Sequence, residues 1–535
     1  MGGWYLATHQ ASSEKELTFS RLTFRRGEIR GARFASDGDT VVYSAAWDGN
    51  PAEIFVASRQ NPEARPLGIQ DAEVLAVSKN AEVAILLRRD RITGLGTLAR
   101  VPLAGGVPRE LADLVAQADW SPDGAQLALI RASNGKYRVE YPLGKVRYET
   151  LHEVREVRVS PDGARVAFLE AHGGETDVVI VSDAAPESIA RGWSHGVNGL
   201  AWSPDGREIW ITGTSTSAPP SLYAVKLNGD TRLVDRLTGS MKLFDISAGR
   251  VLLSNGTWRA ALLYGSVTAP VERDYAWLDW SVLADLSSDG RTILFNETRE
   301  GGGEKSGIYL RRLDTPAAMK IADGFGDALS PDGRLVLTHS GNRLVIVPTG
   351  SGEARELKVA GAFDLGGIWL SDSKRVVVGG ALPGKGYQIH VIDTLEEKIV
   401  TISPETVWGG TTRAFAASPD GRFVAGPTKD ELIARYPADG SLSAVAVAGV
   451  EKGEVPVQWS ADGLSLFVYR PTAMPARVFR INLANGTREL WKEFVPMDPA
   501  GVYKITPIVA TADATAWAYN ALRTTSDLYV AQGLK

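Results

Sequence analysis

The stretch at residues 118–132, ADWSPDGAQLALIRA, decides the fold of this chain. A strand-like segment ends there at the tetrapeptide S-P-D-G, and a second strand-like segment follows. In such a turn Pro122 presets the backbone angle φ, Asp123 can bond backbone amides, and Gly124 accepts the left-handed conformation. Ser121 can cap the turn through its hydroxyl group. The stretch therefore predicts a tight reversal between two antiparallel strands.

The motif recurs along the whole chain in clear, near and faded copies. Clear copies begin at Ser121, Ser160, Ser203, Ser330 and Ser418, near copies at Ser36, Ser287, Ser371 and Ser460, and faded copies at Ser78, Ser247 and Thr511. A mean spacing of about 43 residues is the period of a four-stranded β-propeller blade. We therefore expect an all-β protein of about twelve blades.

The number of blades predicts more than one ring, because propellers usually have about four to eight blades. Two six-bladed rings divide the chain best, and seven plus five blades is a poorer alternative. We predict a leader or linker at 1–16, a first propeller at 17–268 and a second at 269–535. The segment at 17–25 also reads as a strand, which could complete the last blade and clasp the chain ends together. The best short helical candidate is ELADLVAQ at 110–117.

Composition and motifs exclude several functional classes. The chain has 58 Lys and Arg against 63 Asp and Glu, a net charge of −5, which gives no general reason to bind nucleic acid. It has no cysteine, and its six histidines show no metal-ligand spacing. No G-x-S-x-G, H-E-x-x-H, Walker A or kinase motif set occurs. We expect no catalytic residues, no cofactor and no metal site in this chain.

Two groups of tryptophans have different expected roles. Trp120, Trp202 and Trp459 directly precede a motif and Trp369 stands two residues before one, so we expect all four to pack between adjacent blades. Three others lie nine or ten residues ahead of a motif, where the chain enters the innermost strand of a blade. Loops at that point open on one face of the ring around the central channel. Our candidates for ligand binding on this face are Glu28, Arg30, Trp193, His195, Asn198, Trp277, Asp279, Trp408, Thr411 and Arg413.

A concave site with aromatic walls and a few polar groups is the usual form of a binding face. The alternative is that these side chains only fill the rim of the channel. An enzyme reading would need His195, Asp279, Glu28 and Arg413 to converge in space, and no spacing in the sequence shows that they do.

Longer strings of the sequence resemble one family. They are LTFRRGEIRGARFASDG at 22–38, AAWDGNPAEIF at 45–55, GLAWSPDGREIWIT at 199–212, WLDWSVLADLSSDGRTILFNE at 277–297, PARVFRINLANGTRELW at 475–491 and SDLYVAQGLK at 526–535. The S-P-D-G blades resemble WD-like propellers of the TolB type. The strings are similar to the C-terminal propeller region of membrane-anchored bacterial serine/threonine protein kinases.

This resemblance implies a sensor or interaction module outside the membrane, following a kinase domain and one membrane helix. The kinase domain's catalytic residues have no counterpart here, and GGWYLA at 2–7 fits either the end of such a helix or a frayed tail. The implied partner is a small molecule or a peptide or protein, with the oligomeric state left open. Two alternatives remain: a free-standing periplasmic scaffold of the TolB kind, and a propeller hydrolase or lyase.

Overall fold

The computed structural model describes residues 17–58, 63–90, 93–194, 197–214, 220–298, 305–363, 366–406, 413–441 and 443–533. In these ranges every regular element is a β-strand, as the repeat predicts. The predicted leader at 1–16 lies outside them. The chain divides into two compact units: unit 1 is Met1–Thr257 with Thr525–Lys535, and unit 2 is Trp258–Thr524.

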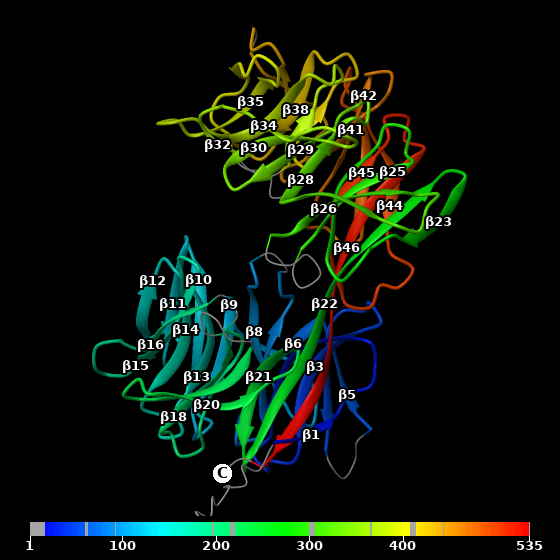
Figure 1. The fold of residues 1–535 in the computed structure, drawn as a ribbon. Coiled ribbons are helices and arrows are strands. Elements are labelled where there is room, and N and C mark those ends of the chain that lie inside the picture. The colour runs from blue at the N-terminus through cyan, green and yellow to red at the C-terminus, as the bar shows by residue number, and fades with distance from the viewer. Residues whose placement is uncertain are drawn as a thin grey trace, which may run out of the picture. The chain divides into compact units, whose positions relative to one another are not determined.

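Unit 1 contains six blades (Figure 1). Blade 1 is β2 (Gly27–Phe34), β3 (Val41–Trp47), β4 (Glu53–Ala57) and β5 (Arg65–Gln70). Blades 2 and 3 form one sheet of β6 (Ala72–Val77), β7 (Glu82–Leu87), β8 (Gly96–Pro102), β9 (Arg109–Trp120), β10 (Leu127–Ser133), β11 (Lys136–Glu140) and β12 (Val146–Thr150). Blade 4 is β13 (Glu153–Val159), β14 (Val166–His172), β15 (Glu175–Val181) and β16 (Glu187–Ser194). Blade 5 is β17 (Leu200–Trp202), β18 (Glu208–Gly213), β19 (Ser221–Lys226) and β20 (Thr231–Arg236).

The sixth blade of unit 1 is built from both ends of the chain. Its strands are β21 (Ser240–Ser247), the first part of β22 (Arg250–Ser266), the last part of β46 (Ala516–Gln532), and β1 (Thr18–Arg21). β1 pairs antiparallel with β46, with Thr18 opposite Gln532 and Arg21 opposite Tyr529. The first strand of the chain therefore lies beside its last strand.

Unit 2 contains six blades as well. One combines β45 (Val502–Ala510), the first part of β46, the last part of β22, and β23 (Ala269–Asp274). The next are β24 (Ser281–Leu286), β25 (Thr292–Glu297), β26 (Gly307–Arg312) and β27 (Met319–Asp323), then β28 (Phe325–Leu329), β29 (Leu335–Ser340), β30 (Arg343–Pro348) and β31 (Arg355–Glu356). The fourth is β32 (Ala362–Phe363), β33 (Ile368–Trp369), β34 (Arg375–Ala381), β35 (Tyr387–Asp393) and β36 (Ile399–Thr401). The last two are β37 (Ala416–Ala417), β38 (Phe423–Pro427), β39 (Ile433–Pro437) and β40 (Val445–Ala446), then β41 (Val455–Trp459), β42 (Ser465–Tyr469), β43 (Ala476–Asn482) and β44 (Arg488–Phe494).

Each unit closes into a ring around its innermost strands. In unit 1 the contacts run in turn through β2, β6, β9, β13, β17, β21 and back to β2. In unit 2 they run through β24, β28, β33, β37, β41, β45 and back to β24. The protein is thus a pair of six-bladed β-propellers.

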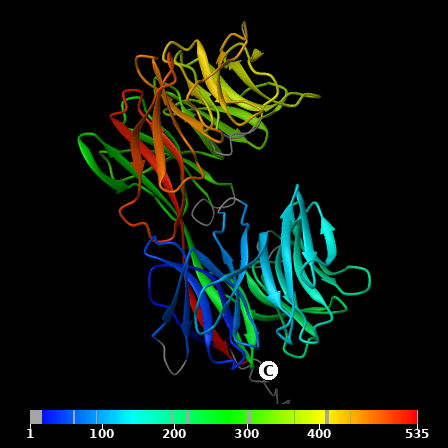
Figure 2. The same ribbon diagram turned by 180° about the vertical axis from the view of Figure 1, so that it is seen from behind.

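The two long strands β22 and β46 lie side by side in both views and take part in both units (Figures 1 and 2). The chain leaves unit 1 at Thr257 within β22 and returns at Thr525 within β46. The sequence places this division at 268/269 and assigns the last residues to the second propeller. The observed division differs from the predicted one because the chain crosses between the units inside two continuous strands. No loop-like composition indicates this crossing in the sequence.

Residues 110–117, our candidate helix, are part of β9. The first part of β9 pairs with β8, and the part after Val115 pairs with β10. This strand passes from blade 2 into blade 3, so pairing on both sides outweighs the local helical spacing. The prediction of a helix here is wrong.

The S-P-D-G turns form as their chemistry predicts. The Oγ of Ser121 accepts a hydrogen bond from the amide of Gln126 at 2.9 Å, and the carboxylate of Asp123 accepts one from the amide of Ala125 at 3.0 Å. Gly124 has a φ of +68°, which favours glycine. The hydroxyl of Ser121 also donates to Asp123. These bonds lower the pKa of Asp123, and the same pattern recurs at Ser160, Ser203 and Ser418.

The tryptophans that precede the turns pack between blades, which confirms their predicted role. Trp202, Trp369 and Trp459 are all buried. Their indole Nε1 groups donate to backbone carbonyls two residues before the turn of the preceding blade, at 3.2 Å to Arg158, 3.2 Å to Ala328 and 3.0 Å to Ala416. Each of these indoles therefore fastens its own blade to the one before it.

Candidate functional site

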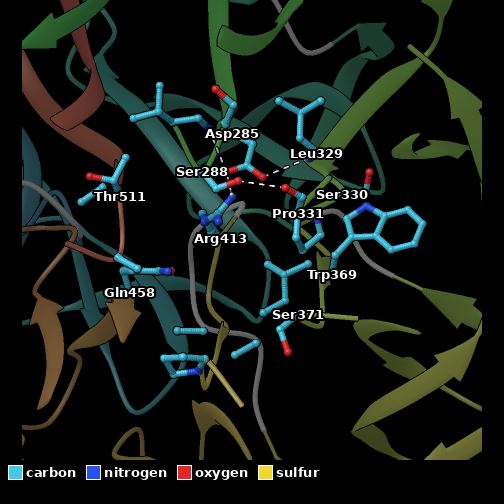
Figure 3. A pocket seen from close by; sticks show the side chains of 18 of the residues that line it. Asp285, Ser288, Leu329, Ser330, Pro331, Trp369, Ser371, Arg413, Gln458 and Thr511 are labelled. Carbon is cyan, nitrogen blue, oxygen red and sulfur yellow. Dashed lines mark hydrogen bonds and ion pairs between the residues drawn. The ribbon is translucent and has the colours of Figure 1, made fainter. Parts of the chain in front are cut away.

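The central channel of unit 2 contains a cavity of about 250 Å³ at the end where the innermost strands run into their turns (Figure 3). All six blades contribute to its lining, one residue from each being Asp285, Leu329, Trp369, Ala416, Gln458 and Thr511. The cavity exists because residues directly before each turn are the last inward-facing positions of the innermost strands. In a concave site on the axis of a ring, side chains from several blades can contact one ligand at the same time.

Arg413 lies three residues before β37, and its guanidinium group reaches Asp285 on β24. The Nη1 to Oδ1 distance is 2.7 Å, and the two side chains are 12% and 8% exposed. The same Nη1 donates to the carbonyl of Ala284 at 3.2 Å. β24 and β37 belong to blades three places apart in a ring of six, so this ion pair joins opposite sides of the channel.

Asp285 is fixed by the backbone as well as by Arg413. Its Oδ1 accepts a hydrogen bond from the amide of Leu286 at 2.8 Å, and its Oδ2 accepts one from Leu329 of the next blade at 3.0 Å. Burial raises the pKa of Asp285, and the attraction of Arg413 offsets only part of this effect. The carboxylate therefore depends on its partner for its charge.

Two polar groups at this cavity are available for further bonds. The Nε of Arg413 is buried without a hydrogen-bond partner among the described residues. Gln458 lines the cavity and makes no side-chain hydrogen bond within the part of the chain that the structure describes. By contrast, the hydroxyl groups of Ser330 and Ser418 donate to Asp332 and Asp420 of their own turns at 2.6 Å. The cavity therefore offers the amide group of Gln458 and the guanidinium group of Arg413, while the hydroxyls of Ser330 and Ser418 are engaged in their own turns.

Two of the predicted residues of unit 1, Glu28 and Arg30, belong to an ion cluster. Arg30 lies 3.2 Å from Glu28 and 2.9 Å from Glu73, and Arg89 lies 2.7 Å from Glu73. Burial opposes ionisation of Glu73, but Arg89 and Arg30 outweigh it and lower its pKa. Arg30 is thus already paired with two carboxylates. The ion pairs of this cluster join blades 1 and 2.

Trp193 does not line a channel. It lies on β16, the outermost strand of blade 4, and only 8% of it is exposed. Its ring packs edge-on against Tyr223 of blade 5, with 4.9 Å between centroids. Counting back from the turn placed Trp193 at the entry to β17, but β16 extends to Ser194, so this residue belongs to the core between two blades.

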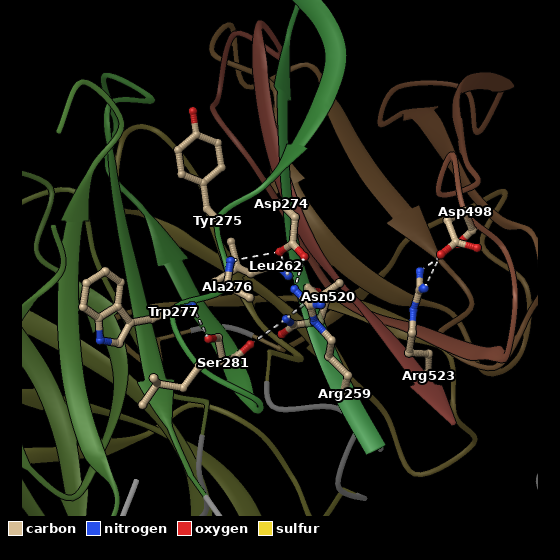
Figure 4. A network of polar contacts seen from close by, with 12 residues as sticks. Arg259, Leu262, Asp274, Tyr275, Ala276, Trp277, Ser281, Asp498, Asn520 and Arg523 are labelled. Carbon is tan, nitrogen blue, oxygen red and sulfur yellow. Dashed lines mark hydrogen bonds and ion pairs between the residues drawn. The ribbon is translucent and has the colours of Figure 1, made fainter. Parts of the chain in front are cut away.

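Trp277 lies in the segment that leads into β24 (Figure 4). Asp279 belongs to the same segment, two residues before β24 begins. Trp277 is 40% exposed, and the guanidinium of Arg311 lies 5.8 Å from its ring centroid. Its amide donates to Ser281 at 2.8 Å, and the carbonyl of Asp279 accepts from Ala260 at 3.1 Å. This segment is held by the backbone, with the Trp277 ring on the surface.

Asn520 holds the segment that leads into β24 in place through hydrogen bonds (Figure 4). Its Oδ1 accepts from the amide of Leu283 at 2.7 Å, and its Nδ2 donates to the carbonyls of Ser281 at 2.8 Å and Ala261 at 3.1 Å. Asn520 is fully buried on β46. It therefore joins the blade that contains β22 and β46 to the blade of β24.

The structure does not bring together those of the remaining predicted residues that it describes. Asn198 is exposed in unit 1, and its amide donates to the carbonyl of Thr212. His195, Trp408 and Thr411 lie outside the described residues. Of the four residues in the enzyme reading, Glu28 is in unit 1 while Asp279 and Arg413 are in unit 2. Among the candidates that lie in the described ranges, Arg413 alone lines the cavity of unit 2 described above.

Sequence reasoning missed Asp285 and Gln458, although a signal for them existed. Both lie two residues before the first residue of a turn, on an innermost strand. Polar residues recur at this position in other blades, at Arg33, Asp119, Arg158 and Asp245. In a strand otherwise made of buried apolar residues, this pattern marks side chains that face a channel rather than a core.

The described residues contain no group of three or more His, Cys, Asp or Glu side chains arranged to hold a metal ion. In the same ranges there is no helix with the length and hydropathy required to cross a membrane.

Comparisons with known proteins concern the fold. No protein-family model and no curated protein matches the chain. Among solved structures it is similar to the tricorn protease, at a TM-score of 0.36 and 12% identity over 94% of this chain and 58% of that one. It is also similar to a GH74 enzyme of Niastella koreensis (TM-score 0.35, 11% identity, 92% and 90% covered). A third is the β-propeller domain of the Trilobed protease from Pyrococcus furiosus (0.31, 12%, 71% and 96%). The chain thus spans 58% of the length of the tricorn protease.

Proposed function

We propose that this chain is a non-catalytic binding module, the extracytoplasmic sensor part of a membrane-anchored bacterial serine/threonine kinase. The cavity in the channel of unit 2 is its binding site, and the ligand is a small molecule or a segment of a peptide or protein. The observation that carries the proposal is this cavity, where a buried ion pair and an unpaired amide meet on the axis of a closed ring. The family resemblance of the longer strings supports the attachment to a kinase.

The chemistry of the cavity supports binding rather than catalysis. Asp285 is held by Arg413 and by two backbone amides, so it is not free to accept a proton from a substrate. Ser330 and Ser418 use their hydroxyl groups inside their turns. A nucleophile would need an adjacent base within hydrogen-bond reach. What the site offers instead are fixed hydrogen-bonding groups that can select a ligand.

The proposal can be tested by affinity selection. The full chain is immobilised and exposed to a defined library of dipeptides and small metabolites, and the retained compounds are identified by mass spectrometry. The control is the double variant Asp285→Leu/Arg413→Met, which replaces the ion pair with apolar side chains of similar size. We expect compounds that the wild type retains and the double variant does not. If both proteins retain the same set, or nothing is retained, the cavity is not the binding site.

A further inference from the structure

Unit 1 has a cavity of about 260 Å³ at the matching place in its own channel. All six innermost strands of that ring line it, through Arg33, Val77, Asp119, Arg158, Ala201 and Asp245 among others. The two arginines come from blades 1 and 4, which lie opposite each other in the ring. Unlike unit 2, this cavity therefore contains two buried guanidinium groups.

Arg33 has no carboxylate partner. The residue is only 6% exposed. No Asp or Glu oxygen of the described residues lies within 4.0 Å of its side-chain nitrogens. Nη1 donates to the carbonyls of Ala32 at 2.7 Å and Phe244 at 3.1 Å, while Nε is buried without a partner among the described residues. A buried charge is costly unless it is paired. Arg33 is thus satisfied only in part.

Arg158 adds a second positive charge at the same point. Its Nη2 also donates to the carbonyl of Phe244, and its Nε donates to Leu200 at 2.9 Å. Two guanidinium groups therefore share one carbonyl oxygen. Burial, and then the like charge of Arg158, lower the pKa of Arg33 to about 10. A negative group placed between them would relieve both the repulsion and the unfilled hydrogen bonds.

The acidic residues of this channel are already engaged. The two carboxylate oxygens of Asp245 accept from the amides of Phe34 and Ile246, both at 3.0 Å. Asp119 accepts from the amide of Val159 at 2.9 Å, and its other oxygen is 3.8 Å from Arg158. Their backbone bonds hold these carboxylates against the channel wall. They still limit the total negative charge that the cavity can accept.

Glu156 and Lys242 do not change this balance, because they pair with each other at 2.6 Å. The charges of the two arginines and the two aspartates also cancel. Among anionic ligands, one with a single negative charge disturbs the charge balance of such a site least. A phosphate dianion would bring a second negative charge close to Asp119 and Asp245. The planar fork of a guanidinium group matches the two oxygens of a carboxylate.

We propose that the channel of unit 1 binds a small organic monoanion through its carboxylate group, which accepts hydrogen bonds from Arg33 and Arg158. The volume suits a ligand of a few carbon atoms, and Trp202 and Val77 provide apolar walls beside the charged end. This site is separate from the cavity of unit 2 and does not depend on attachment to a kinase.

The experiment uses propionate as the probe and the full chain as the protein. Saturation-transfer difference NMR, in a buffer free of other carboxylates, gives the dissociation constant by titration. Propionamide, which has the same shape without the charge, is the ligand control. Arg33→Met is the test variant, and Arg435→Met in unit 2 is the matched protein control, because Arg435 also has a buried Nε without a partner among the described residues and lines neither cavity. Arg33→Lys is the second variant, in case Arg33→Met does not fold, because it retains the charge and loses the fork.

We expect wild type and Arg435→Met to bind propionate within twofold of each other. Arg33→Met should bind it at least tenfold more weakly, Arg33→Lys several-fold more weakly, and propionamide at least tenfold more weakly than propionate. The proposal is overturned if propionate gives no saturation transfer, if Arg33 variants bind as wild type does, or if Arg435→Met loses binding equally. Inorganic phosphate that displaces propionate at a tenfold lower concentration would reassign the site to phosphate and reject the carboxylate.

Discussion

Asp285 and Arg413 are 2.7 Å apart across the channel of unit 2, although they are 128 positions apart in the sequence and three blades apart in the ring. Both side chains are almost fully buried, so the pair tests whether the ring closes as described. Removing one partner leaves a charge without compensation in a site of low dielectric constant. Replacing both removes the desolvation cost together with the attraction.

The first prediction concerns this pair. Asp285→Ala should lower the free energy of unfolding of unit 2 by about 3–5 kcal/mol, because Arg413 is left buried and unpaired. Asp285→Leu/Arg413→Met should recover most of that loss. Denaturant unfolding followed by tryptophan fluorescence measures both variants. If the double variant is as unstable as Asp285→Ala, the ion pair is not the cause.

The second prediction concerns the indole bonds between blades. Trp459→Phe removes the hydrogen bond to Ala416 and leaves a buried carbonyl without this donor, at a cost of about 1–3 kcal/mol. Trp120 occupies the same position in its blade, is also buried, and its Nε1 has no partner among the described residues. Trp120→Phe therefore shows the cost of the smaller ring alone. We expect Trp459→Phe to be the more destabilising by about 1 kcal/mol in denaturant unfolding, and equal costs would contradict the bond.

The third prediction is a pH dependence in unit 1. Burial opposes ionisation of Glu156, but Lys242 and the nearby arginines outweigh it and lower its pKa to about 2. Because the folded pKa lies below the unfolded value of about 4.5, the stabilisation is present above that pH. It is lost as the pH falls from about 4.5 toward 2. Glu156→Gln should lose about 2–3 kcal/mol of stability at pH 7 and progressively less in acid. A difference from wild type that stays constant down to pH 3 would contradict this assignment.

The fourth prediction follows from the shared strands. A chain that ends at Thr524 lacks the part of β46 that pairs with β1 in unit 1, but it retains the part that pairs with β45 in unit 2. Removing the C-terminus should therefore open the N-terminal ring and leave the C-terminal ring folded. Hydrogen-exchange mass spectrometry reports each ring separately. Loss of protection in 269–510 with unit 1 unchanged would instead indicate two propellers in simple series.

The all-β class, the number of blades and the turns could be predicted from the sequence because their signals are local. Ser121, Asp123 and Gly124 form their turn through bonds to neighbours within five residues. The crossing of the chain between units was not predicted, because it lies inside β22 and β46 and depends on strands far apart in the sequence. The prediction of a helix at 110–117 was wrong for a similar reason, since pairing with two blades decided the structure of β9.

The candidate site was predicted only at Arg413. Its pairing with Asp285 was not predicted, because it depends on how many blades lie between the two residues in the ring. The spacing of motifs in the sequence does not give that distance in space. Trp193 was assigned to a channel by counting residues, whereas its contact with Tyr223 shows that it belongs to a core between blades. We chose the candidate residues mainly around tryptophans. Polar residues that lie two positions before a turn were the better indicator of the channel.

The reading frame upstream of Met1 tests the proposed function most directly. We predict that it continues through an apolar segment of about 20 residues into a kinase domain with H-R-D and D-F-G motifs. A stop codon followed by a new start, or a cleavable signal peptide directly upstream, would contradict the assignment to a kinase sensor.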